Sequence, residues 1–96
     1  MTVFVVDENQ LDIRRRRLIF RAWHRGIREI DLILGHYVDA HIGEMSNKML
    51  SELEYIMSFD DHDLLTWITG EISPPSEVDG PLFRDIINYH VCINLN

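Results

Sequence analysis

The residues best suited to chemistry in this 96-residue chain are arginines gathered near its start. The segment RRRRLIFRAWHRGIREID, residues 14–31, contains seven arginines ahead of its first acid. An arginine guanidinium carries a fixed positive charge and five donors in a planar fork, which suits it to carboxylates and phosphates. The segment could therefore bind nucleic acid, or it could be a solvated helix face whose arginines pair with acids elsewhere in the fold.

The spacing of these arginines weakens the case for nucleic-acid binding. Successive residues of a helix are about 100° apart, so Arg14, Arg15, Arg16 and Arg17 cannot share one face, and only some could join Arg21 in a stripe along a phosphate backbone. The chain has a net charge of −7, unlike a typical nucleic-acid binder. We expect arginines that pair with acids elsewhere in the fold, and keep nucleic-acid binding through the Arg14–Arg21 stripe as the alternative function.

The turn HRGIREID, residues 24–31, is the second candidate for recognition. Arg25 and Glu29 are four residues apart and could form an ion pair across Gly26. A glycine has no side chain, so another backbone could come close at this point. Arg25, Gly26 and Glu29 could form an interface, but a helix-breaking glycine beside a surface ion pair is the commoner explanation of this pattern.

The remaining polar residues indicate neither a metal site nor an enzyme. The histidines lack the HxxxH and HExxH spacings of helical zinc ligands: they are His24, His36, His41, His62 and His90. The sequence contains no GxSxG motif and no glycine-rich phosphate loop. We therefore expect no catalytic residue and no metal ligand.

Charge is distributed unevenly along the chain. Residues 1–28 carry seven arginines and three acids, a net charge of +4, whereas residues 29–96 carry two basic residues and thirteen acids, a net charge of −11. A molecule polarised in this way tends to orient against a partner. This pattern indicates docking rather than catalysis.

Helices must position these residues. Apolar residues recur at spacings of three and four over residues 10–24 and over residues 27–45, and we expect the second of these helices to be the longest. Gly35 lies inside it at a cost of about 1 kcal/mol relative to alanine. This cost predicts either that something packs closely against Gly35 or that the helix bends there.

The capping residues predict three more helices. Ser46 is suited to cap a helix that closes near Met57. Asp60 is suited to cap a helix that ends at Gly70, by accepting the backbone N–H of Asp63 three residues on. Pro81 opens the last helix. We predict an all-α fold, a compact five-helix bundle that forms a single domain over residues 1–96, with the bundle at about 10–92 and flexible termini.

The sequence also bears on the compartment. No apolar run approaches the roughly 20 residues needed to cross a bilayer. The start lacks the features of a secretory signal or a transit peptide, and Cys92 is the only cysteine. A chain that cannot form an internal disulfide suits a reducing compartment. We expect the bacterial cytoplasm, with the mitochondrial matrix as the alternative.

Two motifs connect the chain with a known family. RGIREID, residues 25–31, resembles the RGxxE signature of the SdhE family, the FAD assembly factors of succinate dehydrogenase. DDHDLLTWI, residues 60–68, is similar to the acidic cap and Leu-x-x-Trp stretch of that family. The order of the motifs, the spacing between them and the five-helix organisation also agree. The resemblance covers roughly residues 10–92, whereas residues 1–9 and the tail CINLN match nothing in the family pattern.

The resemblance implies a function. Members bind the flavoprotein subunit of succinate dehydrogenase, and in some bacteria that of fumarate reductase, and promote covalent attachment of FAD to a histidine of that subunit. FAD would then be a cofactor of the client, and the chain would be an assembly factor rather than an enzyme. A lesser alternative, in which the chain itself carries FAD, has no dinucleotide-binding fingerprint to support it.

The resemblance also implies site residues. Arg25, Gly26 and Glu29 match the signature, Asp31 and Trp67 match adjoining family positions, and Arg28 lies within the motif. We expect Arg25, Gly26, Arg28, Glu29 and Asp31 to bind the partner, with Arg25 bonded to the client and Glu29 bonded either to Arg25 or to the client. The arginine run is denser than the signature requires.

Overall fold

The computed structural model describes the backbone of residues 2–95 and the side chains of residues 11–91. This part of the chain contains five α-helices and one 3-10 turn, and no strand. In chain order they are α1 (Thr2–Trp23), α2 (Arg28–His41), the 3-10 turn η1 (Ile42–Glu44), α3 (Asn47–Met57), α4 (Asp61–Thr69) and α5 (Pro81–Leu95). The predicted all-α fold of five helices is confirmed.

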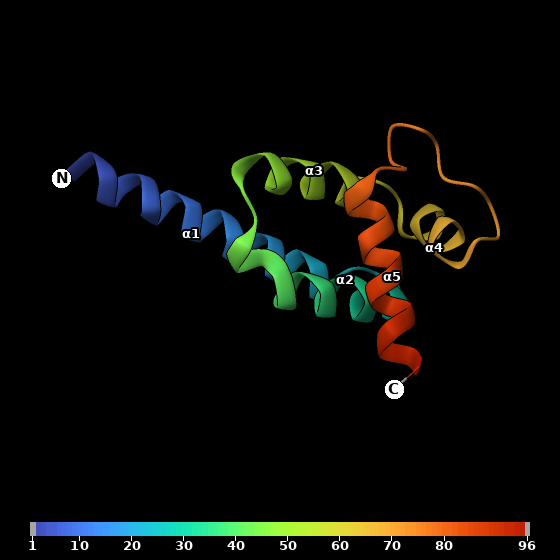
Figure 1. Cartoon of the computed structure of the whole chain (residues 1–96). Coiled ribbons are helices and arrows are strands. Elements are labelled where there is room, and N and C mark those ends of the chain that lie inside the picture. The colour runs from blue at the N-terminus through green and yellow to red at the C-terminus, as the bar shows by residue number, and fades with distance from the viewer. Residues whose placement is uncertain (1, 96) are drawn as a thin grey trace.

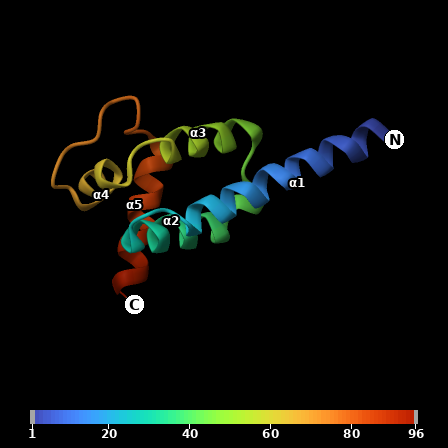
Figure 2. The ribbon, with the colours of Figure 1, turned by 180° about the vertical axis from the view of Figure 1, so that it is seen from behind.

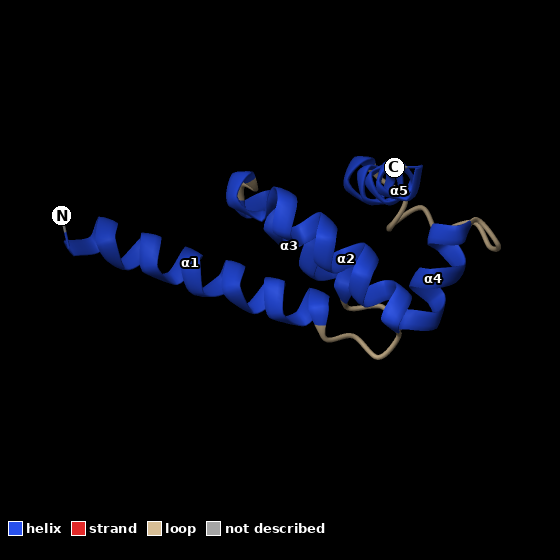
Figure 3. Cartoon of the chain, turned by 90° about the horizontal axis from the view of Figure 1, so that it is seen from below, coloured by secondary structure: helices blue, strands red, loops and turns tan. Residues whose placement is uncertain are grey.

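The helices pack around α2. α1 lies alongside α2, and its N-terminal part extends beyond the other helices (Figure 1; Figure 2 gives the view from behind). α5 crosses α2 and also contacts α3. α4 lies at the end of the bundle away from the N-terminus, where the loop between α1 and α2 reaches it (Figure 3). This arrangement places the turn after α1 against the start of α4.

Apolar side chains from all five helices form one core. The periodic positions face inward because burying each large apolar side chain contributes about 1.5 to 3 kcal/mol. The largest side chains with almost no exposed surface are Leu18, Ile30, Leu34, Tyr37, Val38, Met45, Leu50, Leu53, Leu64, Phe83 and Ile86. The hydroxyl of Tyr37 donates a hydrogen bond to Asp85 of α5, so the core also contains a polar link between α2 and α5.

The predicted helix ends are largely confirmed. The Ser46 hydroxyl accepts the backbone N–H of Met49 at 3.2 Å. Gly70 ends α4 in the left-handed conformation at φ 84°, which favours glycine. Pro81 is the first residue of α5. One detail was wrong: Asp60 accepts the N–H of His62 at 3.0 Å, two residues on, because an N-cap side chain can reach the second as well as the third residue of a helix.

Two helix lengths differ from the prediction. α1 begins at Thr2 rather than near residue 10 and is the longest helix, with 22 residues against 14 for α2. α2 ends at His41, and the chain continues as the 3-10 turn η1. Ile42 and Met45 stay buried through this turn, so the apolar spacing continued although the α-helix had ended.

Gly35 is required by the packing of α1 on α2. A Cβ at this position would lie 2.4 Å from Cδ2 of the Trp23 ring. The same indole donates from Nε1 to Asp39 at 3.1 Å, so the ring is held on the α2 surface. The prediction of a close contact at Gly35 is confirmed.

Candidate partner-binding site

Two carboxylates hold the backbone of the turn between α1 and α2. Asp61, at the start of α4, accepts the backbone N–H of Gly26 at 2.8 Å with one oxygen. Its other oxygen accepts Nε of Arg25 at 2.7 Å. Asp31, in the first turn of α2, accepts the backbone N–H of Arg25. The conformation of residues 24–27 is therefore fixed from both sides by charge-assisted hydrogen bonds.

Arg25 points into the protein. Besides its bond to Asp61, its guanidinium donates to the backbone carbonyls of Met57 and of Phe59, the latter at 2.8 Å. Only 14% of the Arg25 side chain and 18% of the Asp61 side chain are exposed. Arg25 thus ties the turn to the junction of α3 and α4, and it satisfies one carbonyl at the end of α3 and one just after it.

The ion pair that we expected between Arg25 and Glu29 is not formed. A four-residue spacing allows such a pair on one continuous helix, but residues 24–27 interrupt the helix and turn Arg25 towards α4. The residue that the sequence analysis missed is Asp61. From the sequence alone, Asp61 is recognisable only as an acid in the first turn of α4, because nothing in local spacing links it with Arg25, 36 residues away.

Aromatic side chains support this junction. Phe59, whose carbonyl accepts from Arg25, makes an edge-to-face contact with Trp67 at a ring-centroid distance of 5.4 Å. Such pairs contribute about 0.5 to 1.5 kcal/mol beyond the burial of their surface. Trp67 therefore acts on the turn indirectly, by fixing the residue that Arg25 contacts.

The outward side of the turn is formed by Gly26, Arg28 and Glu29, all of which are exposed. Among the residues whose side chains the structure describes, neither Arg28 nor Glu29 has a hydrogen-bond or ion-pair partner there. Of the five predicted site residues, these three face solvent, whereas Arg25 and Asp31 lie beneath them and hold the turn. The structure thus brings the five residues together in two layers.

A groove runs beside Glu29, where α2 meets α4 and α5. It has a volume of about 250 Å³ and is lined by residues that include Glu29, Leu32, His36, Leu65 and Thr69. Leu32 is 42% exposed on its edge. The surface next to the turn therefore combines a carboxylate with apolar area.

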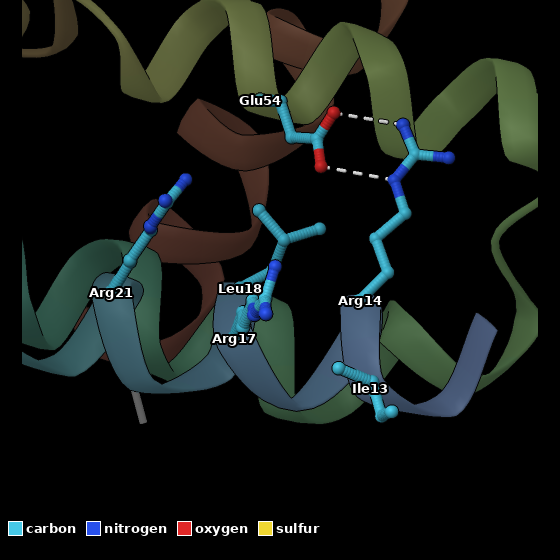
Figure 4. A pocket seen from close by; sticks show the side chains of 6 residues that line it. All are labelled: Ile13, Arg14, Arg17, Leu18, Arg21 and Glu54. Carbon is cyan, nitrogen blue, oxygen red and sulfur yellow. Dashed lines mark hydrogen bonds and ion pairs between the residues drawn. The ribbon is translucent and has the colours of Figure 1, made fainter. Parts of the chain in front are cut away.

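The arginine run is divided among different roles. Arg14 makes a bidentate pair with Glu54 of α3 at 2.8 and 2.9 Å, which holds the pKa of that carboxyl below its usual value (Figure 4). Arg15 donates to the carbonyls of Ile42 and Met45. The expected pairing of arginines with acids elsewhere in the bundle is confirmed for Arg14. Two of the five arginines in the proposed stripe are thus occupied by the fold itself.

The histidines do not gather. Across the side chains that the structure describes, no group of three or more histidine, cysteine, aspartate or glutamate residues is placed to hold a metal ion. His24 stacks on Phe20 at 4.0 Å, and His41 stacks on Tyr37 at 4.2 Å. The side chain of Cys92 lies outside the described residues. Within residues 2–95, no helix is both long and apolar enough for a membrane crossing.

Comparison with known proteins connects this geometry with a family. A family model described as "Flavinator of succinate dehydrogenase" matches residues 16–90, which include the turn and all of α4. A protein of Acetobacter pasteurianus named "FAD assembly factor SdhE" is 38% identical over 82 residues. That alignment covers 85% of this chain and 75% of the Acetobacter protein.

Eukaryotic relatives carry a related name. Proteins of Arabidopsis thaliana and Schizosaccharomyces japonicus, each named "Succinate dehydrogenase assembly factor 2, mitochondrial", are 29% and 32% identical over 96 and 76 residues. These alignments include 97% and 78% of this chain. The chain spans only about half the length of each relative, 51% and 53%. The resemblance to SdhE is thereby confirmed. The chain belongs to the family of succinate dehydrogenase flavinators.

Proposed function

We propose that this protein binds the flavoprotein subunit of succinate dehydrogenase and promotes covalent attachment of FAD to that subunit. The observation that carries the proposal is the family match over residues 16–90, which spans both the turn at Gly26 and the α4 residues that hold it. The name of the Acetobacter relative, an FAD assembly factor, supports the same activity.

The contact surface in this proposal is the outward side of the turn. Gly26, Arg28 and Glu29 face the client, and Arg28 and Glu29 offer it a cation and an anion without an internal partner among the described side chains. Arg25 and Asp31 act beneath this surface by fixing the backbone that presents it. We thus assign Arg25 and Asp31 as positioning residues, in place of a direct bond from Arg25 to the client.

Gly26 supports an external contact because the fold itself does not require a glycine there. Its φ is not in the left-handed region, and a Cβ added to it would meet only Oδ2 of Asp61, at an ordinary 3.4 Å. Gly35, by contrast, is excluded from bearing a side chain by the Trp23 ring. A bare backbone at the exposed position 26 suits close approach by a second chain.

The chain's contribution to the chemistry is geometric in this proposal. Flavin attachment needs the client's histidine aimed at the flavin and charge placed to stabilise the electron density that moves into the ring. A docked partner supplies that geometry by ordering the client, so we assign no nucleophile and no bound FAD to this chain. The flavin belongs to the client throughout.

The client and the compartment are part of the proposal. We take the succinate dehydrogenase subunit as the main client and the fumarate reductase subunit as a second one. The bacterial cytoplasm is our proposed site of action because the Acetobacter relative is bacterial. Relatives named as mitochondrial make the matrix the alternative.

The test is flavinylation of each purified apo-flavoprotein subunit with FAD, in the presence and absence of this protein. Covalent flavin is read as in-gel fluorescence after denaturation. We expect a clear increase with the wild-type chain, and a loss of most of that increase with Glu29→Ala or Arg28→Ala. Glu52→Ala, an exposed acid on α3 far along the chain from the turn, serves as the control. No increase with either subunit would overturn the proposal.

A further inference from the structure

The outer face of α1 remains without a role after the fold and the turn are accounted for. It consists of Ile13, Arg16, Arg17, Phe20 and Arg21, which together line a groove of about 370 Å³. Phe20 is 63% exposed and Ile13 is 43% exposed. Large apolar side chains exposed to this degree, set among cations, are typical of a surface that another molecule covers.

A second groove borders the same face, between α1 and α3. It has a volume of about 410 Å³ and is lined by Ile13, Arg14, Arg17, Leu18, Arg21 and Glu54. In Figure 4, Arg14 and Arg21 lie on either side of Leu18, with Glu54 of α3 bonded to Arg14. Arg17 and Arg21 line both grooves, so they stand on the ridge between them.

Arg17 and Arg21 differ from the other arginines of the run. Arg14 and Arg15 are bonded within the fold, and Arg16 pairs with Asp12 at 2.9 Å. Among residues 11–91, Arg17 and Arg21 form no ion pair, although Arg21 lies near enough to Glu54 to help lower the pKa of that carboxyl. The two are four residues apart on one helix face, where like charges repel by a few tenths of a kcal/mol. Bound anions would relieve this repulsion.

The face is continuous with the proposed contact surface. Phe20 stacks on His24, the first residue after α1, with ring centroids 4.0 Å apart. His24 is followed directly by Arg25 and Gly26. A partner seated on the Gly26 turn can therefore extend along α1 without crossing a buried region of the protein.

We propose that the outer face of α1 is a second docking surface, which binds an acidic segment of the flavoprotein subunit. Cβ atoms four residues apart on a helix are about 5 to 6 Å from each other, so Arg17 and Arg21 select two carboxylates at a similar separation. Phe20 and Ile13 receive an apolar side chain from the same segment. This inference rests on the proposed function, because it takes the same subunit as the partner.

Several features favour an acidic polypeptide over a nucleic acid. Only two of the five arginines between residues 14 and 21 make neither an ion pair nor a hydrogen bond with the described residues, which gives few phosphate contacts. Glu54 lines the groove between α1 and α3, and the whole chain has a net charge of −7. Both negative charges oppose the binding of a long polyanion. One face of the exposed Phe20 ring is already covered by His24.

The experiment compares two double variants that each remove two positive charges. Arg17→Gln with Arg21→Gln alters the proposed surface, and Lys48→Gln with Arg84→Gln alters exposed cations on α3 and α5. The Kd for the purified apo-flavoprotein subunit is measured at low and at high salt, and urea unfolding checks that each variant folds. Gly26→Arg and a single-stranded RNA 20-mer of mixed sequence are included.

We expect the Arg17 and Arg21 variant to bind about tenfold more weakly at low salt, with the difference shrinking at high salt as screening increases. The control variant should bind as the wild type does. Phe20→Ser, which removes apolar contact without changing charge, should weaken binding at both salt concentrations.

Equal effects of the two double variants on the flavoprotein would overturn the inference. So would a loss of RNA binding on replacing Arg17 and Arg21 with no change for the flavoprotein, which would assign the face to nucleic acid. If Gly26→Arg abolishes flavoprotein binding while the Arg17 and Arg21 variant binds normally, only this inference fails. If the wild type binds no flavoprotein subunit, the proposed function fails with it.

Discussion

Asp61 holds the proposed site in place through two different groups of the turn. One oxygen accepts the backbone N–H of Gly26 and the other accepts Nε of Arg25. Removing this carboxylate leaves a mostly buried guanidinium with fewer acceptors, which costs more than losing an exposed ion pair. The residue thus links the stability of the fold with the shape of the contact surface.

Asp61→Ala should lower the free energy of unfolding by about 2 kcal/mol and reduce flavinylation of the client. Urea unfolding measures the first effect and in-gel flavin fluorescence the second. Asp63→Ala, on the same turn of α4 but exposed, is the matched control and should change both readouts little. Similar losses of stability in the two variants would show that Asp61 acts only through the helix dipole.

Gly35 gives a second prediction at the scale of a residue. Gly35→Ala places a methyl group 2.4 Å from the Trp23 ring, so either the ring or the helix must shift. Overpacking of this kind costs about 1 to 3 kcal/mol. Gly43→Ala is the control, because a Cβ there meets nothing within 4 Å. The free energy of unfolding, measured in urea, should be lower for Gly35→Ala than for Gly43→Ala. Equal free energies of unfolding would contradict the packing described.

At the scale of elements, the bidentate pair of Arg14 and Glu54 ties α1 to α3. The guanidinium lowers the pKa of Glu54 below its usual value, mainly through the hydrogen bonds. A lowered pKa in the folded state means that the ionised carboxylate stabilises the fold. This contribution is present above about pH 5 and is lost as the pH falls through the lowered pKa.

Glu54→Gln should therefore destabilise the protein near pH 7, and the difference from the wild type should disappear as the pH falls through the lowered pKa of Glu54. The measurement is the urea midpoint as a function of pH, with Glu52→Gln as a control on the same helix. A constant difference between Glu54→Gln and the wild type at all pH values would mean that the ionised pair contributes nothing.

The ends of most elements could be predicted from single residues, since Ser46, Gly70 and Pro81 act through local backbone geometry. The end of α2 could not. Apolar spacing reports burial rather than hydrogen-bond pattern, and Ile42 stays buried in a 3-10 turn as it would in an α-helix. The same limit applies to the site: the pairing of Arg25 with Asp61 depends on how α4 packs, which no local pattern contains.

At the scale of the whole molecule, the predicted all-α fold and the predicted family are confirmed. The family model is described as a flavinator of succinate dehydrogenase and the relatives are named as assembly factors, which supports the proposal that this chain is an assembly factor. Two motifs, RGIREID and DDHDLLTWI, made the prediction of the family possible. In the structure they meet through Arg25, Gly26 and Asp61. The motifs are far apart in sequence, yet together they build one turn.

The central claim is that the client contacts the bare backbone at Gly26, and a pair of variants at this position tests it most directly. Gly26→Ala adds one methyl group at a tolerated distance from Asp61, and Gly26→Arg adds a long side chain at the same exposed point. Both are predicted to unfold at nearly the wild-type urea concentration. Flavinylation of the apo-flavoprotein should then persist with Gly26→Ala and fall with Gly26→Arg to the level seen without the protein. A folded Gly26→Arg variant that flavinylates the subunit as the wild type does would contradict the account.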